Sequence, residues 1–114
     1  MCGINGILLR SAITPAGLRR AIHAMNGALA HRGPDGDRIW VDETSSAAFG
    51  HRRLSIIDLS AAAAQPMQTD DGSVVMVFNG EIYNFRSLRS ELEAEGHRFY
   101  TSTDTEVIVH AYEQ

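Results

Sequence analysis

Met1-Cys2-Gly3-Ile4-Asn5-Gly6 opens the chain, and the rest of the sequence is organised around this stretch. Cys2 is the only cysteine among the 114 residues. If Met1 is removed, Cys2 carries both a thiol and a free α-amine, and an α-amine titrates at about pH 8. Such a residue is a nucleophile with its own base attached. The simpler alternative is that a lone cysteine is an inert, small, apolar side chain.

The composition is that of an ordinary globular protein with one domain. Apolar residues make up 44% of the chain, and the net charge is −4 with both signs mixed along the sequence. This charge gives no electrostatic case for nucleic acid or an anionic membrane as a partner. One cysteine excludes an internal disulfide and a cysteine-based zinc cluster. We find no signal-peptide pattern and no apolar run long enough to cross a bilayer, so we expect a cytoplasmic protein.

Hydrophobic periodicity and turn residues predict a mixture of strands and helices. Short apolar runs predict strands over residues 3–9, 38–41, 47–50, 74–78 and 98–100, with 74–78 the clearest buried strand. Apolar stripes at helical spacing predict helices over residues 15–30, 85–95 and 105–114. The two kinds of element do not alternate strictly, so we predict an α+β fold with mainly antiparallel pairing.

Capping and turn residues set the expected boundaries of these elements. Thr14 is the predicted N-cap of the first helix, with Pro15 in its first position. Asn84 is the predicted N-cap of the second helix, and Gly96 its C-terminal stop. The pair Asp71-Gly72 predicts a turn before the strand 74–78.

Asn79 and Gly80 follow that strand directly and carry the first candidate chemistry. An acyl transfer at Cys2 needs preorganised hydrogen-bond donors for the tetrahedral oxyanion. The side-chain amide of Asn79 and the backbone N–H of Gly80 supply two such donors. The alternative is a plain Asn-Gly hairpin turn with no chemical role.

Charged residues elsewhere in the sequence match the two ends of a free amino acid. An α-carboxylate is held best by a guanidinium, and Arg53, which precedes an apolar run, is expected to be partly buried. Its neighbour Arg52 is expected to be solvated. An α-ammonium needs carboxylates, which Glu81 and Asp104 supply. The alternatives are that Glu81 is an ordinary surface residue and that Asp104 is a helix cap. Only the whole set of charged residues forms a pocket for a zwitterionic amino acid.

The sequence shows no spacing typical of a metal or phosphate site. The turn 33–36 lacks the lysine and the strand–loop–helix setting of a phosphate-binding loop. We therefore predict no metal ligands and no cofactor in this chain. No metal-ligand spacing relates the histidines His31, His51, His97 and His110.

Six segments form an ordered set of motifs that covers essentially the whole chain. They are Met1-Cys2-Gly3-Ile4, His31-Arg32-Gly33-Pro34-Asp35-Gly36, His51-Arg52-Arg53-Leu54-Ser55-Ile56-Ile57-Asp58, Gln65-Pro66-Met67, Asn79-Gly80-Glu81-Ile82-Tyr83-Asn84 and Asp104-Thr105-Glu106-Val107. With these motifs the chain resembles the N-terminal glutaminase domain of glutamine-dependent asparagine synthetases. These enzymes are class II glutamine amidotransferases with an N-terminal-nucleophile hydrolase fold.

The resemblance implies a fold and a set of site residues. It implies an incomplete αββα sandwich, with residues 1–114 as the N-terminal part of the type-2 amidotransferase domain. Cys2 is the implied nucleophile, which releases ammonia and glutamate from L-glutamine once Met1 is gone. Asn79 and Gly80 form the implied oxyanion hole. The implied glutamine-binding residues are Arg53, Leu54, Ser55, Ile56, Ile57, Asn79, Gly80, Glu81 and Asp104.

The resemblance also implies a partner and leaves alternatives open. In the family a synthetase domain uses ATP, Mg²⁺ and the ammonia to amidate aspartate, and we expect that domain to be absent from this chain. The first alternative is a non-catalytic fragment that binds glutamine at most and needs a partner or the missing strands to fold. The second is a generic α+β domain in which the motifs are structural. Association of the chain with itself stays open.

Overall fold

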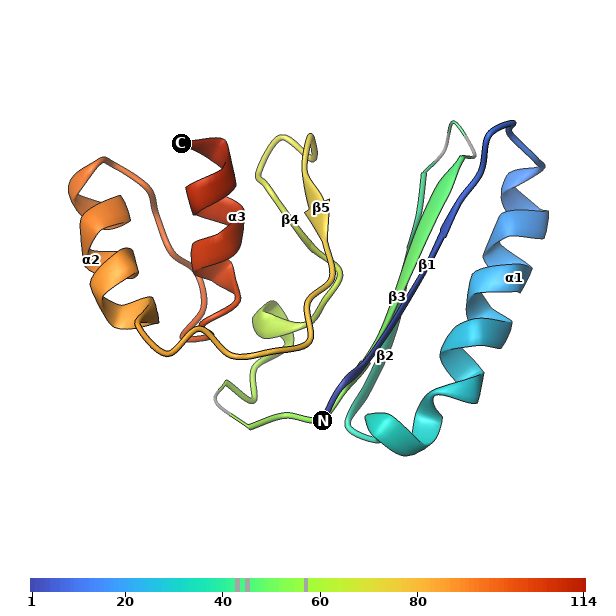
Figure 1. Cartoon of the computed structure of the whole chain (residues 1–114), viewed down its shortest axis with the longest axis horizontal. Helices are drawn as coiled ribbons and strands as arrows, with labels where there is room; N and C mark the ends of the chain where they lie inside the picture. The colour runs from blue at the N-terminus through green and yellow to red at the C-terminus, as the bar shows by residue number, and fades with distance from the viewer. Residues whose placement is uncertain (43, 45, 57) are drawn as a thin grey trace.

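The computed structural model describes residues 1–42, 44, 46–56 and 58–114. The chain forms two groups of elements that lie side by side (Figure 1). The first group contains β1 (Gly3–Leu8), α1 (Pro15–Ala28), β2 (Gly36–Val41) and β3 (Ala47–Arg53). The second contains β4 (Met67–Gln68), β5 (Val75–Met76), α2 (Phe85–Ala94) and α3 (Glu106–Glu113). Two short 3₁₀ turns lie at Ala30–Arg32 and Ala61–Ala63.

The first group is an antiparallel sheet in the order β1-β3-β2 with α1 packed on one face. Leu18 and Ile22 of α1 are fully buried and pack with Val41 and Ala48 of the sheet. The helix begins where the sequence predicts, because the Thr14 side chain accepts a hydrogen bond from the backbone N–H of Gly17 at 3.1 Å. This small core holds the sheet that carries Cys2.

A buried polar network joins the helix to all three strands. Asn26 of α1 is fully buried, and its Nδ2 donates to Asp37 Oδ1 of β2 at 2.5 Å. Asn5 of β1 donates from Nδ2 to Asn26 Oδ1 at 2.7 Å. A Cβ on Gly50 of β3 would lie 2.5 Å from Asn5 Oδ1 and 2.8 Å from Asn26 Oδ1. Only glycine therefore fits beneath these two amides.

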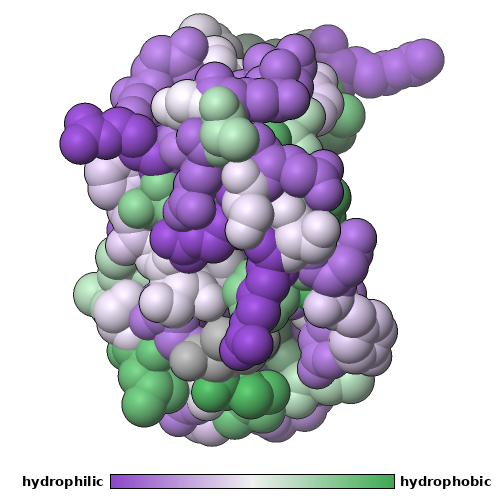
Figure 2. All heavy atoms as spheres, turned by 90° about the vertical axis from the view of Figure 1, so that its left-hand side faces the viewer, coloured by the Kyte–Doolittle hydropathy of each residue, from purple (hydrophilic) through white to green (hydrophobic). Residues whose placement is uncertain are grey.

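The second group packs α3 between the β4–β5 hairpin and α2 (Figure 1). Glu106 begins α3 and is buried, and its carboxylate accepts hydrogen bonds from the backbone N–H groups of Tyr100 and Thr101, both at 2.8 Å. On the side of α2, hydrophilic residues cover most of the molecular surface and hydrophobic residues gather at the lower edge (Figure 2). Among the described residues, no helix is both long and apolar enough to span a membrane.

The predicted class and most predicted elements are confirmed. The fold is α+β, and every strand pair described above is antiparallel. The predicted strand 74–78 is shorter than expected, because Val75–Met76 pairs only with Met67–Gln68 and is half-buried. Beyond it, the backbone N–H of Phe78 donates to the side-chain Oε1 of Gln65 at 2.6 Å instead of to a strand.

One local prediction is wrong, one alternative is excluded, and one cap is confirmed in position only. Residues 98–100 form no strand, since the N–H of Tyr100 is held by the Glu106 carboxylate. Asn79-Gly80 is not a hairpin turn of the Asn-Gly type, because the glycines with positive φ are Gly72 and Gly96. Asn84 lies at the N-cap position of α2, as predicted, but its side chain makes no capping hydrogen bond.

Candidate active site

A cavity of about 370 Å³ lies where β1 begins and β3 ends. The register pairs Gly3 with Arg52, so Cys2, the residue before β1, lies at the end of β3. The backbone N–H of Leu54 donates to Cys2 Sγ at 3.3 Å, and the same sulfur lies 3.6 Å from the Leu54 carbonyl oxygen. Cys2 is therefore half-buried and fixed at the cavity, which Met1 also lines.

The cavity brings together every predicted site residue that the structure describes. Its volume lies in the range of about 300–1,000 Å³ that is usual for small-molecule sites. Ile57 lies outside the described residues, so its role in binding stays a prediction. The lining includes Cys2, Arg53, Leu54, Ser55, Ile56, Asn79, Gly80, Glu81 and Asp104.

Arg53 is held in place by the loop that follows it. Its guanidinium donates to the backbone carbonyl of Ser60 at 2.7 Å and to that of Asp58. A hydrogen bond with the Ser60 side chain, together with those that the Asp58 carboxylate accepts from the N–H groups of Ser102 and Ser60, lowers the pKa of Asp58 to about 2. A guanidinium carries five donors, so the two carbonyls leave others for an anion in the cavity.

Two carboxylates contribute negative charge to the same lining. Asp104 is 5% exposed, and its Oδ2 accepts from the backbone N–H of Ile82 at 2.7 Å. This bond anchors the segment that carries Glu81, which is exposed. With the guanidinium of Arg53, the cavity has one cationic and two anionic groups, the charge pattern that complements a zwitterionic amino acid.

Asn79 and Gly80 present unused polar groups. Among the described residues, the Asn79 side chain has no hydrogen-bond partner although it is half-buried. A Cβ on Gly80 would lie 2.7 Å from the Phe78 ring, so a side chain would not fit here without movement. The free amide of Asn79 is the kind of donor that an oxyanion requires.

His51 lines the same cavity, although it is not among the predicted site residues. It is 3% exposed, and its Nε2 is buried with no hydrogen-bond partner among the described residues. Burial is the main cause that lowers the pKa of His51 to about 4, and the positive charge of Arg53 lowers it further. A hydrogen bond with the Phe78 backbone acts in the opposite direction and raises the pKa. Because His51 stands two residues before Arg53 in β3, the alternation of side chains along a strand puts both on the same face. This spacing is the sequence signal that could have predicted His51 as a cavity residue.

The turn 33–36 supports the site without lining its main cavity. A Cβ on Gly33 would lie 2.3 Å from the Arg52 carbonyl carbon, so glycine is required for the close approach. Asp35 Oδ2 accepts from the backbone N–H of Ser55 at 2.9 Å. The prediction that Arg52 is solvated is wrong, because its side chain is 14% exposed and pairs with Asp37 at 2.9 Å.

Comparisons with known proteins agree with this geometry. The family described as "Glutamine amidotransferase domain" matches residues 1–114. Asparagine synthetase [glutamine-hydrolyzing] 1 of Bacillus subtilis (strain 168) is 43% identical over 98% of this chain and 17% of its own length. A probable asparagine synthetase [glutamine-hydrolyzing] of Dictyostelium discoideum is 40% identical over 99% of this chain and 20% of its own length. Amidase chry2 of Gibberella zeae is 32% identical over 98% of this chain and 18% of its own length. The chain thus spans a fifth or less of these relatives.

Proposed function

The chain belongs to the glutamine amidotransferase domain family, and on that basis we propose that it hydrolyses L-glutamine to glutamate and ammonia at Cys2. The observation that supports this proposal best is the lining of one cavity by a thiol, a guanidinium, two carboxylates and a free amide. These groups are what an amide-hydrolysing site for a free amino acid needs. The roles of the individual residues follow from their chemistry.

The proposed reaction begins when removal of Met1 exposes the α-amine of Cys2. This amine takes the thiol proton while Sγ attacks the carbonyl carbon of the glutamine side-chain amide. The oxyanion is stabilised by the Asn79 side-chain amide and the Gly80 backbone N–H. The proton is passed to the leaving nitrogen, ammonia departs, and water hydrolyses the thioester to release glutamate and the thiol.

The remaining lining residues bind the substrate in this proposal. The guanidinium of Arg53 holds the α-carboxylate, and Glu81 and Asp104 hold the α-ammonium. Leu54, Ser55 and Ile56 line the same pocket. This division of charge is supported by the hydrogen bonds that orient Arg53 and Asp104 before any substrate binds. Preorganised groups of this kind lose little entropy when they bind a ligand.

At the level of the fold and the whole protein, the proposal follows the relatives. We assign residues 1–114 to the N-terminal part of a type-2 amidotransferase domain with an N-terminal-nucleophile αββα sandwich. The relatives named as glutamine-hydrolysing asparagine synthetases support ammonia transfer to a synthetase domain that amidates aspartate with ATP and Mg²⁺. We assign the protein to the cytoplasm, and the proposed hydrolysis uses no cofactor in this chain.

A comparison of glutamate release tests the hydrolysis and separates it from the non-catalytic alternative. The trimmed wild-type chain is compared with Cys2→Ala, and intact mass verifies that Met1 has been removed. Hydrolysis at Cys2 requires release from the wild type and none above background from Cys2→Ala. Equal background rates in both folded proteins would favour the alternative in which the chain at most binds glutamine.

A further inference from the structure

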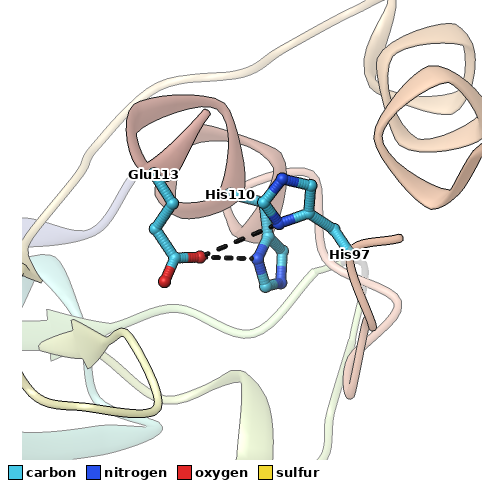
Figure 3. A group of neighbouring side chains, drawn as sticks. All are labelled: His97, His110 and Glu113. Carbon is cyan, nitrogen blue, oxygen red and sulfur yellow. Dashed lines mark hydrogen bonds and ion pairs between the residues drawn. The ribbon is translucent and has the colours of Figure 1, made fainter. Parts of the chain in front are cut away.

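Two imidazoles and one carboxylate point toward one another at the C-terminal end of α3 (Figure 3). His110 and Glu113 lie one turn apart on α3, and His97 lies in the connection between α2 and α3. Each offers one metal-ligand atom, and these atoms all lie within 4.8 Å of one another. None of the three residues lines the cavity that contains Cys2. The cluster is therefore separate from the candidate active site.

The backbone at His97 is fixed by the way α2 ends. Gly96 has a φ of +102°, and its N–H donates to the Glu93 carbonyl at 3.1 Å. The N–H of His97 donates to the Leu92 carbonyl at 3.0 Å. These two bonds form the Schellman motif, in which a left-handed glycine closes the helix. The His97 side chain thus starts from a rigid position facing α3.

The outer nitrogen of each imidazole is next to an oxygen acceptor. His97 Nε2 lies 2.9 Å from Gln114 Oε1, and His110 Nε2 lies 3.4 Å from Glu106 Oε1. At His97 the nearer acceptor lies beside Nε2, which favours a proton there and leaves the Nδ1 lone pair free. At His110 a carboxylate oxygen lies beside each nitrogen, and a neutral ring can donate a proton to only one of them. Glu106 is itself buried and bound to the 100–101 backbone, so its position is fixed.

Both inner nitrogens face the carboxylate of Glu113. Its Oε2 lies 3.0 Å from His110 Nδ1 and 3.9 Å from His97 Nδ1, and the two rings are 5.1 Å apart (Figure 3). A lone pair that faces a carboxylate oxygen is repelled by it unless a proton or a cation lies between them. One divalent cation satisfies both nitrogens and the carboxylate at once, whereas a single proton on His110 Nδ1 satisfies that nitrogen and leaves His97 Nδ1 without a partner in the cluster.

We propose that His97, His110 and Glu113 form a Zn²⁺ site with His97 Nδ1, His110 Nδ1 and a Glu113 oxygen as ligands. Imidazole with carboxylate is a ligand set that suits zinc, and ligands at about 2.0–2.1 Å in a tetrahedron lie about 3.4 Å apart. The three atoms lie within 4.8 Å of one another, so binding requires them to close to that spacing. Gln114 and Glu106 then act as the outer hydrogen-bond acceptors that orient metal-bound histidines.

The site is reachable by solvent and has a structural consequence. The side chains of His97, His110 and Glu113 are 18%, 13% and 32% exposed, so an ion can enter and a water can take the fourth position. A bound ion ties the end of α3 to the connection after α2. Because the unfolded chain does not hold these ligands together, binding stabilises the folded state. The histidines are thirteen positions apart in the sequence, which is why spacing did not reveal them.

Zinc titration of the full chain by calorimetry, after treatment with a chelator, tests the site. The titration uses the Cys2→Ser background so that no thiol competes for the metal. We expect one ion per chain, with a higher melting temperature when zinc is present. The variants His97→Gln, His110→Gln and Glu113→Gln should each weaken binding by at least about tenfold, the loss that follows even from removal of outer-shell partners. The exposed His23→Gln is the matched control and should bind as the parent does.

The imidazole nitrogens give a second readout that does not depend on the stability of the variants. Long-range ¹⁵N–¹H spectra of the same chain should show zinc-dependent shifts of the Nδ1 resonances of His97 and His110, with His23 unchanged. The proposal is overturned if zinc does not bind saturably. It is also overturned if Glu113→Gln and His97→Gln bind zinc as tightly as the parent, or if the shifts occur at other histidines.

Discussion

The backbone N–H of Leu54 donates a hydrogen bond to the Sγ of Cys2 at 3.3 Å, across 52 positions of sequence. The contact exists because β1 and β3 are antiparallel neighbours whose adjoining ends meet. It places the only thiol of the chain beside the loop that orients Arg53. The proposed nucleophile and the proposed carboxylate clamp are thus positioned by the same strand pair.

Substitution of Arg53 should weaken glutamine binding. Arg53→Lys keeps a positive charge but loses the planar fork that can contact both Asp58 and Ser60 while binding a carboxylate. We expect a loss of about 1.5–3 kcal/mol in binding free energy, the usual contribution of a hydrogen bond to a charged group. Calorimetry of glutamine binding in the Cys2→Ala background measures it, with the exposed Arg20→Lys as control. An unchanged dissociation constant would remove Arg53 from the site.

Loss of charge at Asp104 should be separable from loss of structure. Asp104→Asn keeps an oxygen that can accept from the N–H of Ile82 but removes the negative charge proposed to hold the ammonium. We expect glutamine affinity to fall about tenfold, or about 1.4 kcal/mol, with a similar melting temperature.

Glu81→Gln should behave in the same way, with Glu95→Gln, an exposed carboxylate at the end of α2, as its control. Calorimetry and a thermal melt of each variant measure both properties. If affinity is kept in Asp104→Asn and Glu81→Gln, the ammonium is bound elsewhere.

Stability should depend on pH through His51. The folded protein holds His51 neutral down to about pH 4, whereas the unfolded chain binds the proton near 6.5. Between these values the unfolded state binds more protons, so the free energy of unfolding falls as the pH falls from 6.5 to 4. The stabilisation is complete above this window and lost below it, and its full size is on the order of 3 kcal/mol.

Urea denaturation across the same window measures this effect. His51→Gln should show a shallower decrease in stability than the wild type, because the titrating group is gone. The exposed His23→Gln should keep the wild-type slope. Identical slopes in wild type and His51→Gln would show that burial of His51 has no energetic consequence for folding.

The amide network beneath β3 should tolerate no side chain at Gly50. Gly50→Ala places a methyl group within 2.8 Å of the side-chain oxygens of both Asn5 and Asn26, and we expect destabilisation. Overpacking of this kind typically costs about 1–3 kcal/mol. Gly27→Ala on α1 is the control, because its Cβ would meet nothing within 4 Å and should stabilise the helix by up to about 1 kcal/mol. Equal unfolding midpoints of the two variants in urea would contradict the close packing at Gly50.

Local sequence signals predicted the elements that depend on local interactions. The Thr14 cap and the stripe through Leu18 and Ile22 define α1 because capping and burial act within that helix. Gly96 ends α2 because the chain there needs a positive φ. The predicted strand at 98–100 does not form, because the carboxylate of Glu106, six residues after Tyr100, takes a backbone donor that a strand would have used.

The candidate site could be predicted in its members but not in its contacts. Motif chemistry identified Cys2, Arg53 and Asp104, which the fold brings to one cavity. The desolvation of His51 and the bond from Leu54 to Cys2 depend on strand register, which no local pattern specifies. The histidine pair of the proposed zinc site also depends on packing, since His97 and His110 meet only when α3 folds against α2.

Covalent trapping of Cys2 tests the proposed nucleophile most directly. The trimmed chain is incubated with a diazoketone analogue of glutamine, and the peptide that begins at Cys2 is examined by mass spectrometry. Hydrolysis at Cys2 predicts one adduct per chain on this thiol, slowed by excess glutamine and by Arg53→Lys. Absence of the adduct from the folded, trimmed chain, or labelling that glutamine does not slow, would contradict Cys2 as the glutamine-directed nucleophile.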